Sequence, residues 1–144
     1  MRRRGVAHVH SRYSYDGCHA LADIVAFLRG RGLDFVLLSE HVRTLDDAAV
    51  RAIVAECRAL SGDGFLVVPG LEYEASPDFV HVLAYGVDAL APARDVESIA
   101  RAVRAAGGLA VLAHPHYRRA CDHVPARAVG LLHGWEIWNG KADG

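Results

Sequence analysis

A repeating pattern of strand, loop and helix first occurs in residues 5–30, GVAHVHSRYSYDGCHALADIVAFLRG. Gly5–Val9 is a short apolar run typical of a strand, and the ten residues that follow it form a polar loop. The i, i+3, i+4, i+7 spacing of a helix with one buried face then occurs at Leu21, Ile24, Val25 and Leu28. Glycines 30 and 32 end that helix. The stretch therefore predicts a strand, a loop and a helix, with polar residues where the strand ends.

The same unit recurs along the chain. Further strand-like apolar runs occupy residues 35–38, 65–68, 79–85, 109–113 and 135–138. The helical spacing recurs at Val50, Ile53, Val54 and Cys57, and again at Val96, Ile99, Ala100 and Val103. Thr44 or Asp46 is expected to cap the helix that carries Val50 and Cys57. Strands that alternate with helices predict an α/β fold with a mainly parallel sheet, and no linker divides the 144 residues into separate domains.

Composition narrows the class of protein. The chain is 52% hydrophobic and 23% charged with a net charge of -1, which excludes intrinsic disorder. The absence of a basic excess argues against a dedicated nucleic-acid binder. There are 9 histidines, whereas Lys141 is the only lysine. Because histidine is the commonest metal ligand, this surplus indicates metal or acid–base chemistry.

Cysteine usage and the N-terminal sequence indicate a compartment. Cys18, Cys57 and Cys121 are odd in number and widely spaced, which favours a reducing cytosol over a disulfide framework. Met1–Arg4 is followed by no apolar signal core, and no apolar stretch approaches the length of a membrane span. We therefore expect a cytoplasmic protein without membrane contact.

Titratable residues gather where the predicted strands end. They are His8, His10, Glu40, His41, Glu72, His114, His116 and Glu136. In parallel α/β folds, sites form at this edge of the sheet, so these side chains are expected to converge. His8 and His10 stand two residues apart on one strand face and could hold one metal. Taken alone, Glu72 could cap a turn and His81 could be a hydrogen-bonded core residue.

Seven short motifs occur in a fixed order. They are His8–Ser11, Ser14–Gly17, Ser39–His41, Pro69–Glu72, His81–Leu83, Ala113–Pro115 and Glu136–Asn139. This set resembles the PHP family, the polymerase and histidinol phosphatase domain. The resemblance implies a distorted (β/α)7 barrel that carries two or three divalent metal ions at the carboxyl ends of its strands. It also implies a metal-dependent hydrolase that cleaves phosphate esters with a metal-activated water.

The resemblance also implies a ligand set. His8 and His10 would hold the first metal, and Glu72 would bridge it to the second. His81 and His114 would complete the second site, and Asp16 with His41 would bind a third ion. Glu40 stands where family members often carry Asp, and we expect it to orient His41 rather than bind metal. Histidine and carboxylate ligands suit Zn, Mn or Fe.

One family motif, a final Asp-x-His, cannot be found. Only Asp143 follows the last strand-like run, so we expect residues 1–144 to be one PHP-like domain that is incomplete at its C-terminus. Two alternatives stay open. The chain could be a non-catalytic metal-binding remnant or accessory module of a larger protein. It could also be an amidohydrolase, although Lys141 is in the wrong place for the metal-ligating lysine typical of that class.

Candidate substrate contacts come from loops beyond the ligand positions. Arg12, Arg43 and Arg118 could each grip a phosphate, or simply be solvated surface residues. His116 could serve as a general acid or contact the substrate. A small phosphorylated substrate is favoured over a long polynucleotide. Self-association is possible, because an incomplete barrel exposes a sheet edge.

Overall fold

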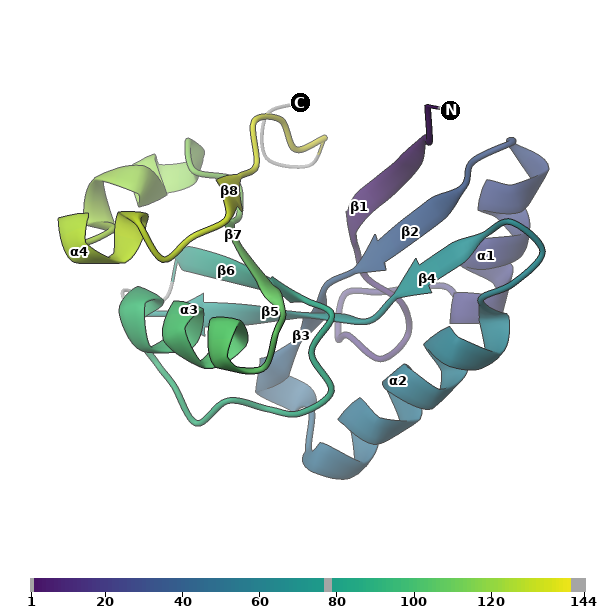
Figure 1. Ribbon diagram of the computed structural model, residues 1–144, viewed down its shortest axis with the longest axis horizontal. Coiled ribbons are helices and arrows are strands. Elements are labelled where there is room, and N and C mark those ends of the chain that lie inside the picture. The colour runs from purple at the N-terminus through teal and green to yellow at the C-terminus, as the bar shows by residue number, and fades with distance from the viewer. Residues whose placement is uncertain (1, 77–78, 141–144) are drawn as a thin grey trace.

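The computed structural model describes residues 2–76 and 79–140 as a mixed α/β fold (Figure 1). Its strands are β1 Gly5–Val9, β2 Phe35–Leu38, β3 Glu40–His41, β4 Leu66–Val68, β5 Gly70–Ala75, β6 Val80–Tyr85, β7 Leu109–Leu112 and β8 Gly134–Trp135. Its α-helices are α1 Leu21–Gly30, α2 Asp47–Leu60, α3 Val96–Ala105 and α4 Ala126–Val129. Two 3-10 helices, η1 Val42–Thr44 and η2 Tyr117–His123, complete the set. No helix in these ranges is long and apolar enough to cross a membrane.

The strands form two open sheets. One has the order β1-β2-β4, and the other has the order β3-β5-β6-β7-β8. Only Ser39 separates β2 from β3, and only Pro69 separates β4 from β5, so two chain segments pass directly from one sheet into the other. Figure 1 shows the sheets as two arms that meet where these segments cross. Within residues 2–76 and 79–140, the strands do not close into a barrel.

Most strand pairs are parallel, as predicted, but β6 runs the other way. It pairs antiparallel with both β5 and β7. The reason is the short connection between β5 and β6, since a parallel crossover needs a dozen residues or more. The beginning of β6 therefore lies beside the end of β5, where His81 pairs with Glu74. This reversal brings His81 to the edge at which the parallel strands end.

The helices follow the predicted spacing. The Asp46 side chain caps α2 by accepting a hydrogen bond from the Ala49 amide at 2.7 Å, whereas Thr44 lies in η1. A first core cluster joins α1 and α2 to the β1-β2-β4 sheet, through residues such as Val25, Val36 and Ile53. A second cluster packs α3 against the other sheet.

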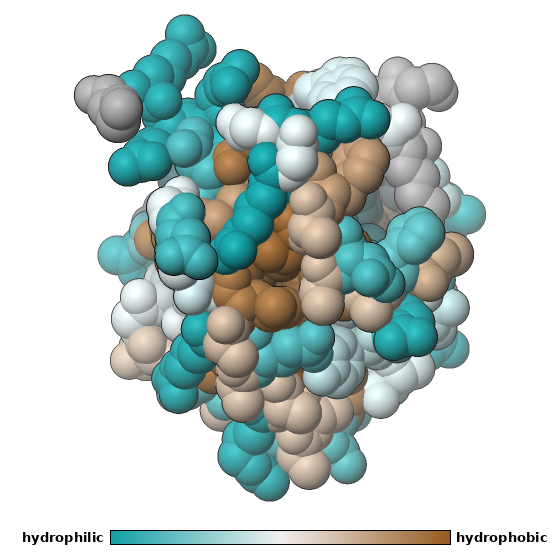
Figure 2. Space-filling view, turned by 90° about the vertical axis from the view of Figure 1, so that its right-hand side faces the viewer, coloured by the Kyte–Doolittle hydropathy of each residue, from teal (hydrophilic) through white to brown (hydrophobic). Residues whose placement is uncertain are grey.

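The face that carries α1 and the β2–β4 arm turns toward the viewer in Figure 2. It shows apolar residues in a central area framed by hydrophilic ones. Phe27 of α1 and Leu66 of β4 are more than half exposed in this arm. Apolar side chains exposed singly are normal on soluble proteins.

Two local predictions were wrong. No strand was predicted between residues 68 and 79, whereas the chain continues after Pro69 as β5, Gly70–Ala75, which carries Glu72. Gly70 is required there, because a Cβ at this position would lie 2.0 Å from the Leu38 carbonyl oxygen. The last strand ends at Trp135 rather than Trp138, and the Ile137 side chain beyond it is 91% exposed.

Candidate metal centre

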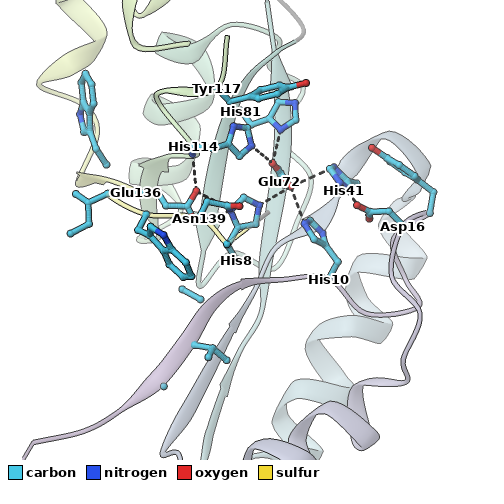
Figure 3. Close-up of a pocket in the computed structure, with 18 residues that line it drawn as sticks. His8, His10, Asp16, His41, Glu72, His81, His114, Tyr117, Glu136 and Asn139 are labelled. Carbon is cyan, nitrogen blue, oxygen red and sulfur yellow. Dashed lines mark hydrogen bonds and ion pairs between the residues drawn. The ribbon is translucent and has the colours of Figure 1, made fainter. Parts of the chain in front are cut away.

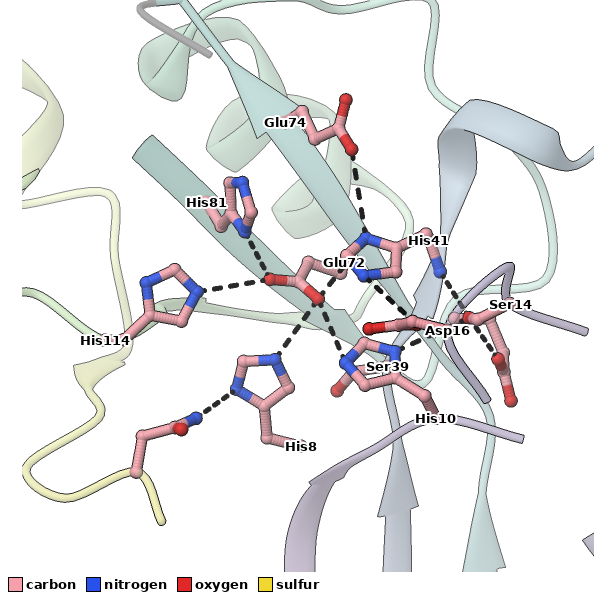
Figure 4. A network of polar contacts seen from close by, with 12 residues as sticks. His8, His10, Ser14, Asp16, Ser39, His41, Glu72, Glu74, His81 and His114 are labelled. Carbon is pink, nitrogen blue, oxygen red and sulfur yellow. Dashed lines mark hydrogen bonds and ion pairs between the residues drawn. The ribbon is translucent and has the colours of Figure 1, made fainter. Parts of the chain in front are cut away.

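One buried carboxylate is the centre of the site. Glu72 of β5 has a side chain that is only 1% exposed, and five histidines surround it (Figure 4). Its Oε1 lies 2.6 Å from Nδ1 of His81 and 3.4 Å from Nε2 of His114. Its Oε2 lies 3.2 Å from Nε2 of His8, 3.3 Å from Nε2 of His10 and 3.5 Å from Nδ1 of His41.

The structure brings all seven predicted metal ligands together in three groups. The first group is His8, His10 and Glu72; the second is Glu72, His81 and His114; the third is His10, Asp16 and His41. Within each group the ligand atoms lie within 4.8 Å of one another. Glu72 is shared by the first and second groups, and His10 by the first and third. Shared ligands place the three groups side by side rather than at separate sites.

Local backbone geometry creates this convergence. β1 carries an irregularity between Val6 and Val9, and His8 has a φ of 58°. His8 and His10 therefore do not project from a regular strand, and their rings meet edge-on with centroids 5.3 Å apart. His81 reaches Glu72 across the antiparallel β5–β6 pair, as a diagonal neighbour on the same face.

The residues present fit divalent cations. A carboxylate offers about four lone-pair positions, which is too few to satisfy five imidazoles. Nδ1 of His41 and Nδ1 of His114 are buried without a hydrogen-bond partner among the described residues. Imidazole and carboxylate donors together suit transition metals such as Zn, Mn and Fe.

Electrostatics in the metal-free chain set the protonation of these groups. Burial lowers the pKa of His8, but hydrogen bonds to Glu136 and Glu72 outweigh it and raise the pKa to about 9. Burial lowers the pKa of His10 to about 4. Burial also raises the pKa of Glu72, yet hydrogen bonds from His114, His8 and His81 hold that pKa well below its usual range. Glu72 is thus ionised and His8 is an imidazolium at neutral pH.

Glu40 was expected to orient His41, and in the structure it does so indirectly, through the side chain of Ser14. The Glu40 side chain is fully buried and accepts hydrogen bonds from the Ser11 amide at 2.9 Å and from Oγ of Ser14 at 2.5 Å. Oγ of Ser14 in turn accepts a hydrogen bond from the His41 amide at 2.9 Å. Glu40 therefore fixes the loop that carries Asp16 and reaches His41 only through Ser14. The Ser14–Gly17 motif was noticed in the sequence, but nothing there showed this bridging role of Ser14.

Sequence reasoning assigned no role to Glu136 and Asn139. The Glu136 carboxylate lies 3.0 Å from Nδ1 of His8, and Nδ2 of Asn139 donates a hydrogen bond to it at 3.2 Å. The signal that pointed to Glu136 was its position at a strand end, which it shares with the ligands.

A cavity of about 840 Å³ opens beside the three groups (Figure 3). The edge strand β1 lines it with Gly5, Val6 and Ala7, and the chain after β7 lines it with Trp135 and Trp138. Tyr15 stacks on the His41 ring at 4.7 Å, and Tyr117 meets the His114 ring edge-on at 5.7 Å. The metal groups therefore face a space large enough for a small molecule, with aromatic and apolar walls.

The four predicted substrate contacts lie outside this lining. His116, Arg12, Arg43 and Arg118 are not among the described residues that line the cavity. Nη1 of Arg43 lies 4.0 Å from Oε2 of Glu74, and the Arg118 guanidinium lies over the Tyr117 ring at 5.3 Å from its centroid. Their roles stay predictions. Asp143 and Lys141 fall outside the described residues.

Comparison with known proteins rests on solved structures. No protein-family model matches the chain, and no curated protein matches it in sequence. A two-domain protein from Bacteroides vulgatus, said to contain a predicted PHP-like metal-dependent phosphoesterase, matches with a TM-score of 0.68 and 20% identity. The match covers 94% of this chain and 44% of that one. The fold is that of the PHP-like metal-dependent phosphoesterases.

Two further solved structures are similar in fold to this chain. One is a protein from Bifidobacterium adolescentis that is described as a candidate metal-dependent phosphoesterase. It matches with a TM-score of 0.69 and 16% identity, and the match covers 98% of this chain and 80% of that one. An amidohydrolase from Chromobacterium violaceum, with bound sulfate and no metal, matches with a TM-score of 0.70 and 16% identity, covering 93% and 76%. This chain thus spans less than half of the Bacteroides protein and most of the other two.

Proposed function

We propose that this chain is a metal-dependent hydrolase of phosphate esters that binds two or three divalent ions. The observation that carries the proposal is Glu72, a buried carboxylate shared between two groups of potential metal ligands beside a cavity. A carboxylate in this position could bridge two ions and hold them close together, and neighbouring ions can stabilise both the attacking and the leaving oxygen of phosphoryl transfer. The names of two structural neighbours as phosphoesterases support the same reaction class.

We assign the ligands group by group. His8 and His10 would hold the first ion with Glu72, while His81 and His114 would hold the second with the same carboxylate. Asp16 and His41 would hold a third, and His10 lies close enough to contribute to it. Zn, Mn and Fe all suit this donor set.

When bound, such ions lower the pKa of a coordinated water and neutralise phosphoryl oxygens. The protein contributes position and environment. Ring nitrogens of five histidines are directed at Glu72, and Trp135, Trp138 and β1 form an apolar wall of the cavity. Arg12, Arg43 and Arg118 are proposed phosphate contacts, and His116 is a proposed proton donor for the leaving group.

The substrate that we propose is a small phosphorylated molecule in the cytoplasm. The sulfate bound to the Chromobacterium protein is a tetrahedral anion like phosphate, which supports this ligand chemistry. The net charge of -1 offers little attraction for a long polynucleotide.

We further propose that residues 1–144 belong to one PHP-like domain of the distorted (β/α)7 class. Two features support this. β1 and β8 each have a single neighbour among the described strands, and residues of both line the same cavity. A ring of strands would close between these edges. The same open edges would also be the place for self-association.

The test is to measure bound transition metal and then assay phosphomonoesters and phosphodiesters with Mn²⁺ added. Metal-dependent ester hydrolysis that disappears in Glu72→Gln supports the proposal, measured as phosphate release from monoesters and as alcohol release from diesters. Metal-loaded protein that binds ions but cleaves no ester indicates a non-catalytic metal-binding module. Amide and lactone substrates belong in the panel because one structural neighbour is named an amidohydrolase, and their cleavage in place of esters would redirect the assignment.

A further inference from the structure

We infer that Glu136 is a positioning residue that stabilises the unusual backbone conformations of His8 and His114. These two histidines are ligands of two different metal groups. The inference rests on the proposed metal-binding function. It assigns to Glu136 no direct contact with metal or substrate. Its role is to fix the direction in which two ligands present their ring nitrogens.

One carboxylate reaches both histidines (Figure 3). Oε1 and Oε2 of Glu136 lie 3.0 and 3.2 Å from Nδ1 of His8. Oε2 also accepts a hydrogen bond from the backbone amide of His114 at 2.7 Å. Nδ2 of Asn139 donates to the same Oε2 at 3.2 Å, which keeps the carboxylate in place.

Both histidines have backbone conformations that need support. His8 has a φ of 58° and His114 a φ of 25°, in a region that non-glycine residues rarely adopt. The other non-glycine residues with positive φ, among those described, are the exposed Asp63, Arg118 and Arg119. Strained residues inside a site persist only when surrounding contacts hold them. Glu136 makes such a contact to each of the two.

The position of Glu136 explains why a side chain must do this. His8 lies on β1 and His114 follows β7, and β1 is not hydrogen-bonded to β7 or β8 in the described sheets. Glu136 directly follows β8 and links the two edges. By accepting from Nδ1 of His8, it leaves Nε2 of that ring directed at Glu72, 3.2 Å away. A histidine fixed in this way through its second nitrogen is a more rigid metal ligand.

The experiment compares the rate at which excess chelator removes metal from the loaded wild-type chain, Glu136→Gln and Glu136→Ala. We expect metal loss to accelerate about 10–100-fold in Glu136→Ala, the range known for partners of metal-bound histidines. Glu136→Gln keeps the shape but has only one acceptor oxygen, so its rate should fall between the two. Glu97→Gln, which alters a partly buried carboxylate that is paired with Arg101 and Arg127 away from the metal groups, is the control and should match wild type in the rate of metal loss.

A second readout needs no metal. Hydrogen exchange at the His114 amide should accelerate about tenfold or more in Glu136→Ala, because the hydrogen bond to a charged acceptor is lost. Thermal unfolding shows whether each variant is folded, and Glu136→Gln serves if Glu136→Ala is not. Wild-type rates of both metal loss and amide exchange in the folded variants would overturn the inference. If the Glu136 variants lose metal faster but the wild-type chain cleaves no ester, the result would contradict the proposed reaction and leave the inference about Glu136 supported.

Discussion

Metal uptake by this protein should release a proton from His8. Hydrogen bonds to Glu136 and Glu72 outweigh burial and raise the pKa of His8 to about 9 in the metal-free chain. At pH 7 this ring is therefore about 99% protonated, whereas an unperturbed imidazole would be only about one-quarter protonated. A protonated imidazole has no lone pair for a metal, so binding at the first group must displace the proton.

The size of the effect follows from the same pKa. Removing the proton from His8 at pH 7 costs about 3 kcal/mol, which is two pKa units. The apparent affinity of the first group should therefore rise about tenfold for each pH unit between about 7 and 9 and level off above that range. A histidine with an ordinary pKa would give an almost flat profile over the same interval.

Isothermal titration calorimetry in buffers of different ionisation enthalpy counts the released protons. Glu136→Gln is the comparison, because it removes one of the two carboxylates that raise the pKa of His8 while leaving the metal-facing nitrogen unchanged. Wild type should release more protons at pH 7 than this variant. Equal proton release by the two proteins, or an affinity that is flat from pH 7 to 9, would refute the reasoning.

Four other results are expected. In the metal-free chain, the raised pKa of His8 stabilises the fold below pH 6.5, and about 3 kcal/mol of this is lost as pH rises from 6.5 to 9; urea unfolding at both pH values measures it. Glu72→Gln should reduce bound metal, measured by elemental analysis, to no more than the ion of the third group. Ser14→Ala leaves Oε2 of buried Glu40 without its donor and the His41 amide without its acceptor, and should lower the free energy of unfolding by about 1–3 kcal/mol. Ile99→Ala, at a fully buried position of α3, should cost about 2–5 kcal/mol in the same assay.

The regular part of the fold could be predicted because it depends on local periodicity. The spacing of Leu21, Val25 and Leu28 predicts α1, and these three side chains are buried in it. One feature depended on a contact distant in sequence. The continuation of the chain through Pro69 and Gly70 depends on the close approach of Gly70 to the Leu38 carbonyl.

The convergence of the site was predictable for a similar reason. Titratable residues at successive strand ends must meet when the strands lie side by side, which is how Glu72 and His114 were singled out. The supporting contacts were not predictable. The bridge from Glu40 through Ser14 to the His41 amide, and the link from Glu136 to His8, join residues that no periodicity relates.

The most direct test of the proposed reaction is hydrolysis of a panel of phosphate monoesters and diesters by the purified chain, with its metal first removed and then restored as Mn²⁺. We predict hydrolysis by the restored wild-type chain, none by the metal-free chain, and none by Glu72→Gln under the same conditions. A wild-type chain that takes up metal at the expected groups and still leaves every ester intact would contradict the proposed hydrolase function.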